Sequence, residues 1–116
     1  CALGKAMLAH KSLEELKEIY KSYSLYKHTS NTITNLDKLY NDLRKVRSKG
    51  YSVNEAETFE YVYGIGAAIL DSQNRAIAAI SISGTRGSIN LKTIPSLSEK
   101  VIRTSKEISL KLLEVD

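Results

Sequence analysis

Apolar residues recur at helical spacing in the first half of the chain. Ser12 and Glu15 have the spacing of a capping box, and an apolar stripe continues from there to Tyr20. A second stripe begins after Asn35, a favourable N-cap residue, and ends before Gly50, which suits the position after a helix. The pattern therefore predicts two helices, with a polar loop between them.

The middle of the chain is extended and its end is helical. Residues 51–57 alternate weakly, and residues 61–70 and 76–83 are rich in β-branched and small residues. A polar turn, residues 71–75, joins the last two segments, so these strands should pair antiparallel. Residues 92–114 have an apolar stripe at helical spacing. The order of elements predicts an α/β (α+β) fold, an antiparallel sheet flanked by helices, in one domain over residues 1–116.

The short turn allows the pairing of the last two strands to be predicted. If Gln73-Asn74 forms the turn, Ser81 lies opposite Gly66, and Ser83 lies opposite Gly64. Directly opposite residues point to the same side of a sheet, so one face would carry two hydroxyls and two glycines. The other face would carry large apolar residues covered by helices: Tyr63, Ile65, Ile69, Ile80 and Ile82.

The face with the serines and glycines has two interpretations. It could be a small hollow in which Ser81 and Ser83 orient a polar ligand. Alternatively, the glycines could mark close packing of a helix, with the serines facing water. The pattern alone leaves both interpretations open.

Composition and charge exclude several classes. The net charge is +4, but the dense basic run, residues 44–49, falls at a predicted helix end, where cations complement the helix dipole. This favours a solvated helix end over a nucleic-acid surface. The chain has one cysteine and two histidines, so we expect no disulfide, metal or cofactor. No segment approaches the roughly eighteen apolar residues of a membrane span, and we expect a cytoplasmic protein.

An enzyme and a pure oligomerisation module are the competing interpretations. The candidate nucleophiles are Cys1 and the two serines, and the candidate bases are His10 and His28. No spacing joins them into a nucleophile, base and orienting group, so we expect no catalytic residue. The narrow stripe of the last helix could instead serve as a dimer face.

Four segments carry a family resemblance. Residues 1–9 look like an "A-x-G-K-A-x-L-A" helix, and residues 29–34 resemble a "T-x-N-T-I-T" loop. Residues 46–51 resemble "V-R-x-x-G-Y", and residues 78–84 resemble "A-A-I-S-I-S-G". Together, in this order and at this spacing, they resemble the effector-binding domain of the IclR family of transcription regulators.

The resemblance implies a fold similar to GAF or profilin-like sensor domains. It implies a small organic effector (an organic or aromatic acid, or a sugar-derived compound) and a homodimer or homotetramer. It also implies that the chain is the C-terminal part of an effector-binding domain. DNA would then be bound only through an N-terminal winged helix-turn-helix that lies outside this chain.

The family's effector contacts carry over unevenly to this sequence. Its two serines match Ser81 and Ser83, and its backbone contacts match Ala2 and Leu3. Asn54 stands where the family has Asp, and Gly64 stands where it has Cys. Val62 matches an apolar position of the family, and Tyr63, between Val62 and Gly64, replaces an Arg. Because Asn54 carries no charge and Gly64 no side chain, the replacements favour an effector larger or less charged than a small keto acid.

Overall fold

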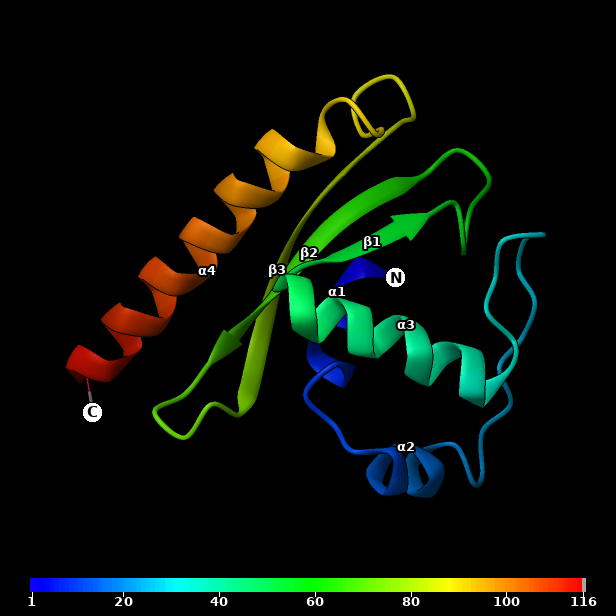
Figure 1. The fold of residues 1–116 in the computed structure, drawn as a ribbon, viewed down its shortest axis with the longest axis horizontal. Helices are drawn as coiled ribbons and strands as arrows, with labels where there is room; N and C mark the ends of the chain where they lie inside the picture. The colour runs from blue at the N-terminus through cyan, green and yellow to red at the C-terminus, as the bar shows by residue number, and fades with distance from the viewer. Residues whose placement is uncertain (116) are drawn as a thin grey trace.

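Four helices and three strands make up the computed structural model, which describes residues 1–115 (Figure 1). The elements are α1 (Ala2–Leu8), α2 (Leu13–Ile19), α3 (Leu36–Lys49), β1 (Ser52–Glu55), β2 (Tyr63–Leu70), β3 (Ala76–Gly84) and α4 (Ile94–Val115). The predicted combination of helices with an antiparallel sheet is confirmed.

Local sequence signals set the helix ends as predicted. Ser12 Oγ accepts the N–H of Glu15, and the Glu15 carboxylate accepts the N–H of Ser12, which completes the capping box. Asn35 Oδ1 accepts the N–H of Lys38 at the start of α3. Gly50 ends α3 with a φ of 87°, a left-handed conformation that glycine adopts without strain.

The sheet has the order β1-β2-β3, with both neighbouring pairs antiparallel. Gly64 pairs with Ser83 and Gly66 with Ser81, so the predicted register of the last two strands is confirmed.

The predicted turn of this hairpin was wrong by one residue. Asp71 N–H donates to Arg75 O at 2.9 Å and Asn74 takes a φ of 60°, so the loop contains Ser72 as well as Gln73 and Asn74. A register shift between Ile69 and Leu70 compensates for the additional residue. The strands therefore regain the predicted pairing beyond the turn.

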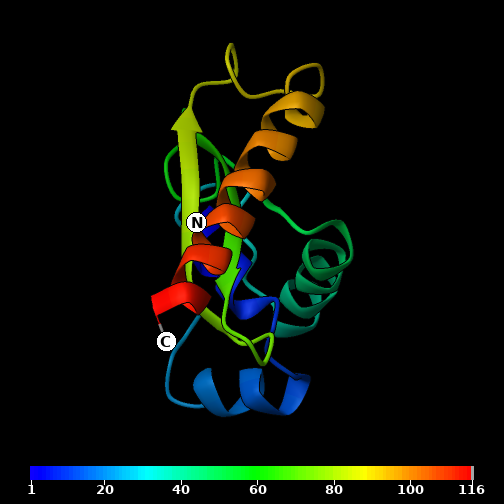
Figure 2. The ribbon, with the colours of Figure 1, turned by 90° about the vertical axis from the view of Figure 1, so that its left-hand side faces the viewer.

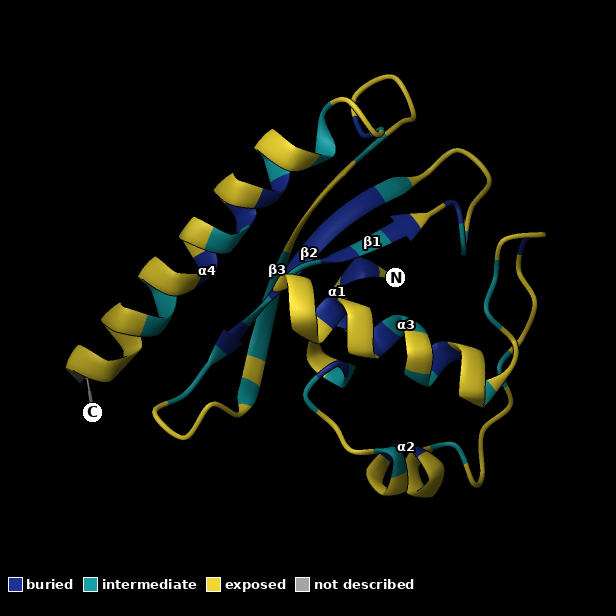
Figure 3. Ribbon diagram, viewed as in Figure 1, coloured by how far each residue is buried: buried dark blue, intermediate teal, exposed yellow. Residues whose placement is uncertain are grey.

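The face of β2 that carries Ile65 and Ala67 packs against α4. Both residues are buried together with Ile89 and Val101, and Ile80 packs beside them. Figures 1 and 2 both show α4 running lengthwise along the sheet, and Figure 3 shows burial on its sheet-facing side. The predicted apolar face is therefore covered by a helix, although Ile82 at its end keeps 37% of its surface exposed.

The opposite face of β2, which carries the glycines, is covered by α1. At Gly66, a Cβ atom would lie 2.7 Å from the Ala2 carbonyl oxygen and 2.9 Å from Ser52 Oγ. The interpretation of Gly66 as space for a ligand was therefore wrong, because its missing side chain makes room for the backbone of α1. A second apolar cluster joins the end of α1 to α2 and α3 through Ala9, Leu16, Leu39, Leu43 and Val46.

This close approach predicts the effect of a single methyl group. Gly66→Ala should lower the free energy of unfolding by about 1–3 kcal/mol, because the Cβ atom would overlap the α1 backbone. Urea unfolding followed by circular dichroism measures the change. Gly87→Ala is the matched control, since its Cβ would lie 3.6 Å from the nearest side-chain atom. Equal stability of both variants would contradict the packing of α1 on Gly66.

Candidate functional site

One row across the sheet contains three of the predicted site residues. Gly64 on β2 pairs with Asn54 on β1 and with Ser83 on β3, so the three point to the same face. A Cβ atom at Gly64 would lie 3.5 Å from Ala2 Cβ and 3.8 Å from Asn54 Cβ. The structure thus brings the first residue of α1 against the middle of this row.

A second, parallel row positions α1. Ser52 on β1 pairs with Gly66, and Gly66 pairs with Ser81. The Ser52 hydroxyl is fully buried and donates to the Ala2 carbonyl oxygen at 2.6 Å. This hydrogen bond holds the first turn of α1 on the sheet.

The predicted site residues differ in their exposure. Ala2 and Asn54 are buried, and Gly64 lies beneath Ala2. Ser81 and Ser83 are exposed at the edge strand. Leu3 and Val62 are also partly open to solvent. The predicted site is therefore buried where Ala2 covers Asn54 and Gly64, and it is exposed at Ser81 and Ser83 on β3.

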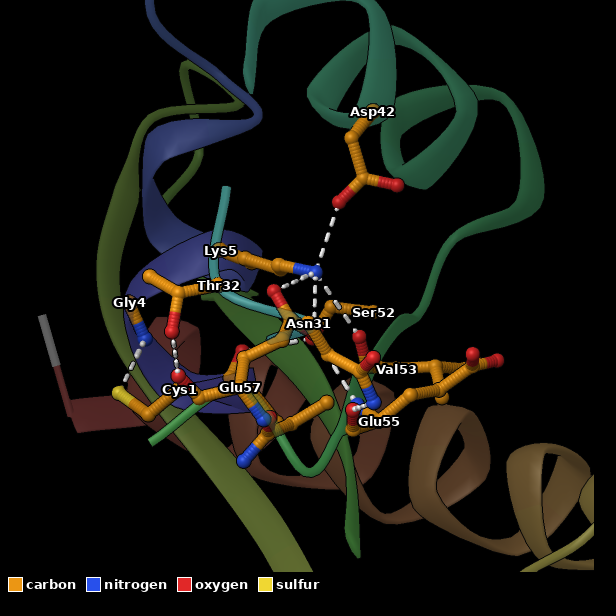
Figure 4. Close-up of polar contacts among 12 residues, drawn as sticks. Cys1, Gly4, Lys5, Asn31, Thr32, Asp42, Ser52, Val53, Glu55 and Glu57 are labelled. Carbon is orange, nitrogen blue, oxygen red and sulfur yellow. Dashed lines mark hydrogen bonds and ion pairs between the residues drawn. The ribbon is translucent and has the colours of Figure 1, made fainter. Parts of the chain in front are cut away.

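A buried ion cluster next to these rows was not predicted from the sequence. Lys5 on α1 has 9% of its side chain exposed, and its Nζ lies 2.8 Å from both Asp42 Oδ2 and Glu57 Oε1 (Figure 4). Lys5 Nζ also donates to Val53 O at 3.0 Å. One ammonium group therefore links α1 to α3, to β1 and to the loop after β1.

A sequence signal for Lys5 was present. Lys5 lies three residues after Ala2 and four before Ala9, on the helix face formed by these buried alanines. A lysine among small apolar residues at helical spacing indicates a buried charge, which requires a partner. Its partners are distant in sequence, so their identity could not be read from this pattern.

Glu57 belongs both to the ion cluster and to the predicted site. Its carboxylate binds Lys5, while its backbone N–H donates to Asn54 Oδ1 at 3.0 Å. The chain turns back at Ala56, whose φ is 56°. Two side chains stabilise this turn from outside: Thr29 donates to Ala56 O at 2.6 Å, and Asn31 donates to Glu55 O at 2.9 Å. The T-x-N-T-I-T segment therefore holds the loop that orients Asn54.

The depressions described on the surface do not include the predicted site residues. The largest of those described, of about 740 Å³, is lined by Val53, Glu55 and Tyr63 and by residues between Arg86 and Ile94. One of about 440 Å³ is lined by the ion cluster and by Lys45, Lys49 and Tyr51. Another of about 670 Å³ lies between α3 and α4 and includes His10. None of the predicted site residues lines either one.

The candidate nucleophiles and bases come from different segments: Ser81 and Ser83 lie on β3, His10 follows α1, and His28 lies in the loop before α3. His10 lies after the end of α1, beside Arg47. The pKa of His10 is lowered mainly by burial and, to a smaller extent, by the positive charge of the Arg47 guanidinium. Asp71 lies in the turn of the hairpin, at the opposite end from Ser83. Within residues 1–115, no group of three His, Cys, Asp or Glu side chains could hold a metal ion. None of the helices described has both the length and the hydropathy to cross a membrane.

Comparison with known proteins gives a consistent result. Residues 1–110 match the family described as "Bacterial transcriptional regulator IclR C-terminal". The chain is 32% identical over 107 residues to the HTH-type transcriptional regulator BhcR of Paracoccus denitrificans, covering 92% of this chain and 38% of the relative. It is 34% identical over 109 residues to the HTH-type transcriptional repressor AllR of Escherichia coli, covering 94% and 40%.

The fold is similar to that of a solved regulator. The crystal structure of the Thermotoga maritima IclR superposes with a TM-score of 0.89 at 36% identity, covering 96% of this chain and 45% of that chain. The chain thus spans about two fifths of the length of the curated relatives BhcR and AllR.

The ion cluster predicts that removal of the positive charge of Lys5 strongly destabilises the fold. Lys5→Met should lower the free energy of unfolding by about 3 kcal/mol, because the carboxylates of Asp42 and Glu57 would lose their shared counterion. This loss of stability is at the low end of the range for breaking a buried ion pair, because Asp42 keeps 34% of its side chain exposed. Lys11→Met is the control: Lys11 pairs with Glu15 at 3.7 Å on the surface, and its loss should cost under about 1 kcal/mol. Similar effects of both variants in urea unfolding would contradict the role of Lys5.

Proposed function

The chain belongs to the bacterial transcriptional regulator IclR C-terminal family, and we propose that it is an effector-binding domain whose small organic ligand alters the affinity of the regulator for DNA. The relatives are named as transcriptional regulators and repressors. A sensor of this kind couples two sites, one for the effector and one for DNA.

The observation that carries the proposal is the meeting of Ala2, Asn54, Gly64 and Ser83. Three strands and the start of α1 converge there, and these are the positions that the family resemblance assigns to the effector. Leu3, Val62 and Ser81 extend the proposed site toward solvent. Hydroxyl and amide groups on a rigid sheet can orient a small polar molecule.

The proposed effector is an organic or aromatic acid or a sugar-derived compound, bound without a cofactor. Asn54 and the serines are uncharged, and the adjacent charges of Lys5 and Glu57 are paired with each other. This lining favours a ligand larger or less charged than a small keto acid.

The DNA-binding part of the proposed mechanism lies outside this chain. BhcR and AllR are named as HTH-type proteins, and this chain covers only 38–40% of their length. We propose that a winged helix-turn-helix preceding this domain contacts DNA, and that the regulator acts in the cytoplasm. No catalytic step is part of this proposal.

We also propose that the domain assembles into a homodimer or homotetramer. The C-terminal half of α4 exposes 62% of Leu110, 40% of Leu112 and 45% of Leu113 (Figure 3). Leu110 and Leu113 are three residues apart and share one face of the helix, and neighbouring exposed leucines of this kind are typical of an association surface.

Ser83→Ala tests the effector site. Because the Ser83 hydroxyl is exposed on β3, its removal should leave the unfolding free energy unchanged. The affinity for the effector should fall by about fivefold to tenfold, through loss of one hydrogen bond. Calorimetry with organic acids, sugars and aromatic compounds measures the affinity, with the exposed turn residue Ser72→Ala as control. An unchanged affinity would place the effector elsewhere.

Leu110→Glu tests the association surface. The charge should shift the mass measured by light scattering toward that of the monomer, since a buried unpaired carboxylate opposes association. Leu91→Glu is the control, because Leu91 is 89% exposed before α4 begins. A monomeric mass of the unaltered chain at every concentration would contradict this proposal.

A further inference from the structure

The depression between α3 and α4 lies outside the proposed effector site. It measures about 670 Å³, which is within the range of small-molecule sites. Its lining comes from α1, α3, β2 and α4, and it includes none of the seven predicted site residues. The exposed Leu110 and Leu113 also line it, so this cleft borders the proposed association surface. A compound bound in the cleft would leave the effector site free.

The helical walls of the cleft are apolar on the inside. Val46 of α3 and Ile102 of α4 line it, together with two serines of α4. The serine hydroxyls are turned to protein groups. Ser105 donates to Ile102 O at 2.7 Å. Ser109 donates to Ser105 O at 3.0 Å and accepts the Leu70 N–H at 3.2 Å. An apolar part of a ligand can therefore lie here without burying an unpaired hydroxyl.

One residue of β2 offers its backbone to the cleft. Gly66 O faces β1, where it accepts from the Ser52 hydroxyl at 3.4 Å, and the Leu70 N–H faces Ser109. Ala68 lies between Gly66 and Leu70, so its N–H and C=O point to this same side of the strand. Pairing with β1 ends at Ser52, and no hydrogen bond described from the loops or side chains of residues 1–115 reaches Ala68. Ala68 thus presents one donor and one acceptor to the cleft that it lines.

The rim of the cleft is positively charged. Arg47 and Lys49 at the end of α3 and Lys106 on α4 are exposed. None of them belongs to an ion pair described within residues 1–115. The acidic residue of the lining, Asp71, is already paired, since its Oδ2 lies 2.8 Å from Arg75 Nε. The excess of positive charge favours a ligand with an anionic group.

We propose that this cleft is a second ligand site, and that its ligand is an N-acyl amino acid. The amino-acid part takes the place of a paired strand residue: its amide N–H donates to Ala68 O, and its carboxylate accepts the Ala68 N–H. The carboxylate also lies within the field of the rim cations, and the acyl chain lies against Val46 and Ile102. A fatty acid lacks the amide, and a free amino acid lacks the apolar chain, so each would satisfy only part of the cleft.

Four probes separate these contacts by calorimetry against the unaltered chain. N-octanoylglycine carries all three groups. N-octanoylsarcosine lacks the amide N–H, N-octanoylglycinamide lacks the charge, and N-acetylglycine lacks the long chain. N-octanoylglycine should bind at least about tenfold more tightly than each of the others, as expected for loss of one hydrogen bond, one charge or several buried methylenes. Equal binding of N-octanoylglycine and N-octanoylsarcosine would overturn the pairing with Ala68.

Variants place the probe in the cleft. Arg47→Gln should weaken N-octanoylglycine by about fivefold to tenfold through loss of a charge-assisted contact. Arg103→Gln is the matched control, because Arg103 is exposed on α4 and does not line the cleft. Both residues are exposed, so circular dichroism should show that both variants fold.

Ser83→Ala separates this inference from the proposed function and should leave the affinity for N-octanoylglycine unchanged. Weakening by Ser83→Ala but not by Arg47→Gln would overturn the inference and support the effector site instead. No saturable binding of N-octanoylglycine, or equal effects of Arg47→Gln and Arg103→Gln, would also overturn the inference.

Discussion

The buried ammonium of Lys5 is the interaction on which the arrangement of this domain depends. A charge removed from water requires partners with good geometry, and those of Lys5 come from α3, from β1 and from the loop after β1. The placement of α1 brings all of them within 3.0 Å of Nζ, a distance typical of charge-assisted hydrogen bonds. Ser52 fixes the first turn of the same helix through the Ala2 carbonyl. Together these contacts hold a helix of only seven residues against the sheet.

The proposed effector site follows from that placement. With α1 fixed, Ala2 lies against Gly64, and Asn54 lies beside both. Glu57 connects the two systems, since its carboxylate binds Lys5 while its backbone N–H orients Asn54. A ligand that moved Asn54 would thus disturb a residue tied to α1 and, through Lys5, to Asp42 on α3. This is a continuous physical connection between the proposed site and a helix on the outside of the domain.

Much of the fold could be predicted from local signals in the sequence, whereas the contacts between distant segments could not. The cap at Ser12, the end of α3 at Gly50 and the pairing of Gly64 with Ser83 follow from residues close together in sequence or from strand alternation. The turn was wrong by one residue because an extra residue in β3, Ile77, compensated for its length. Two contacts join segments that are about 37 to 64 residues apart: α1 packs on Gly66, and Lys5 pairs with Asp42 and Glu57. The periodicity of the sequence does not encode contacts over such distances.

Nuclear magnetic resonance can locate a small organic effector bound where the start of α1 meets the row of Asn54, Gly64 and Ser83. The ¹⁵N-labelled chain is titrated with organic acids, and the shifts of its backbone amides are mapped on the structure. If the effector binds there, saturable shifts should be concentrated at Ala2, Asn54 and Ser83. Shifts confined to the depression between α3 and α4, around His10 and Ile102, would contradict it.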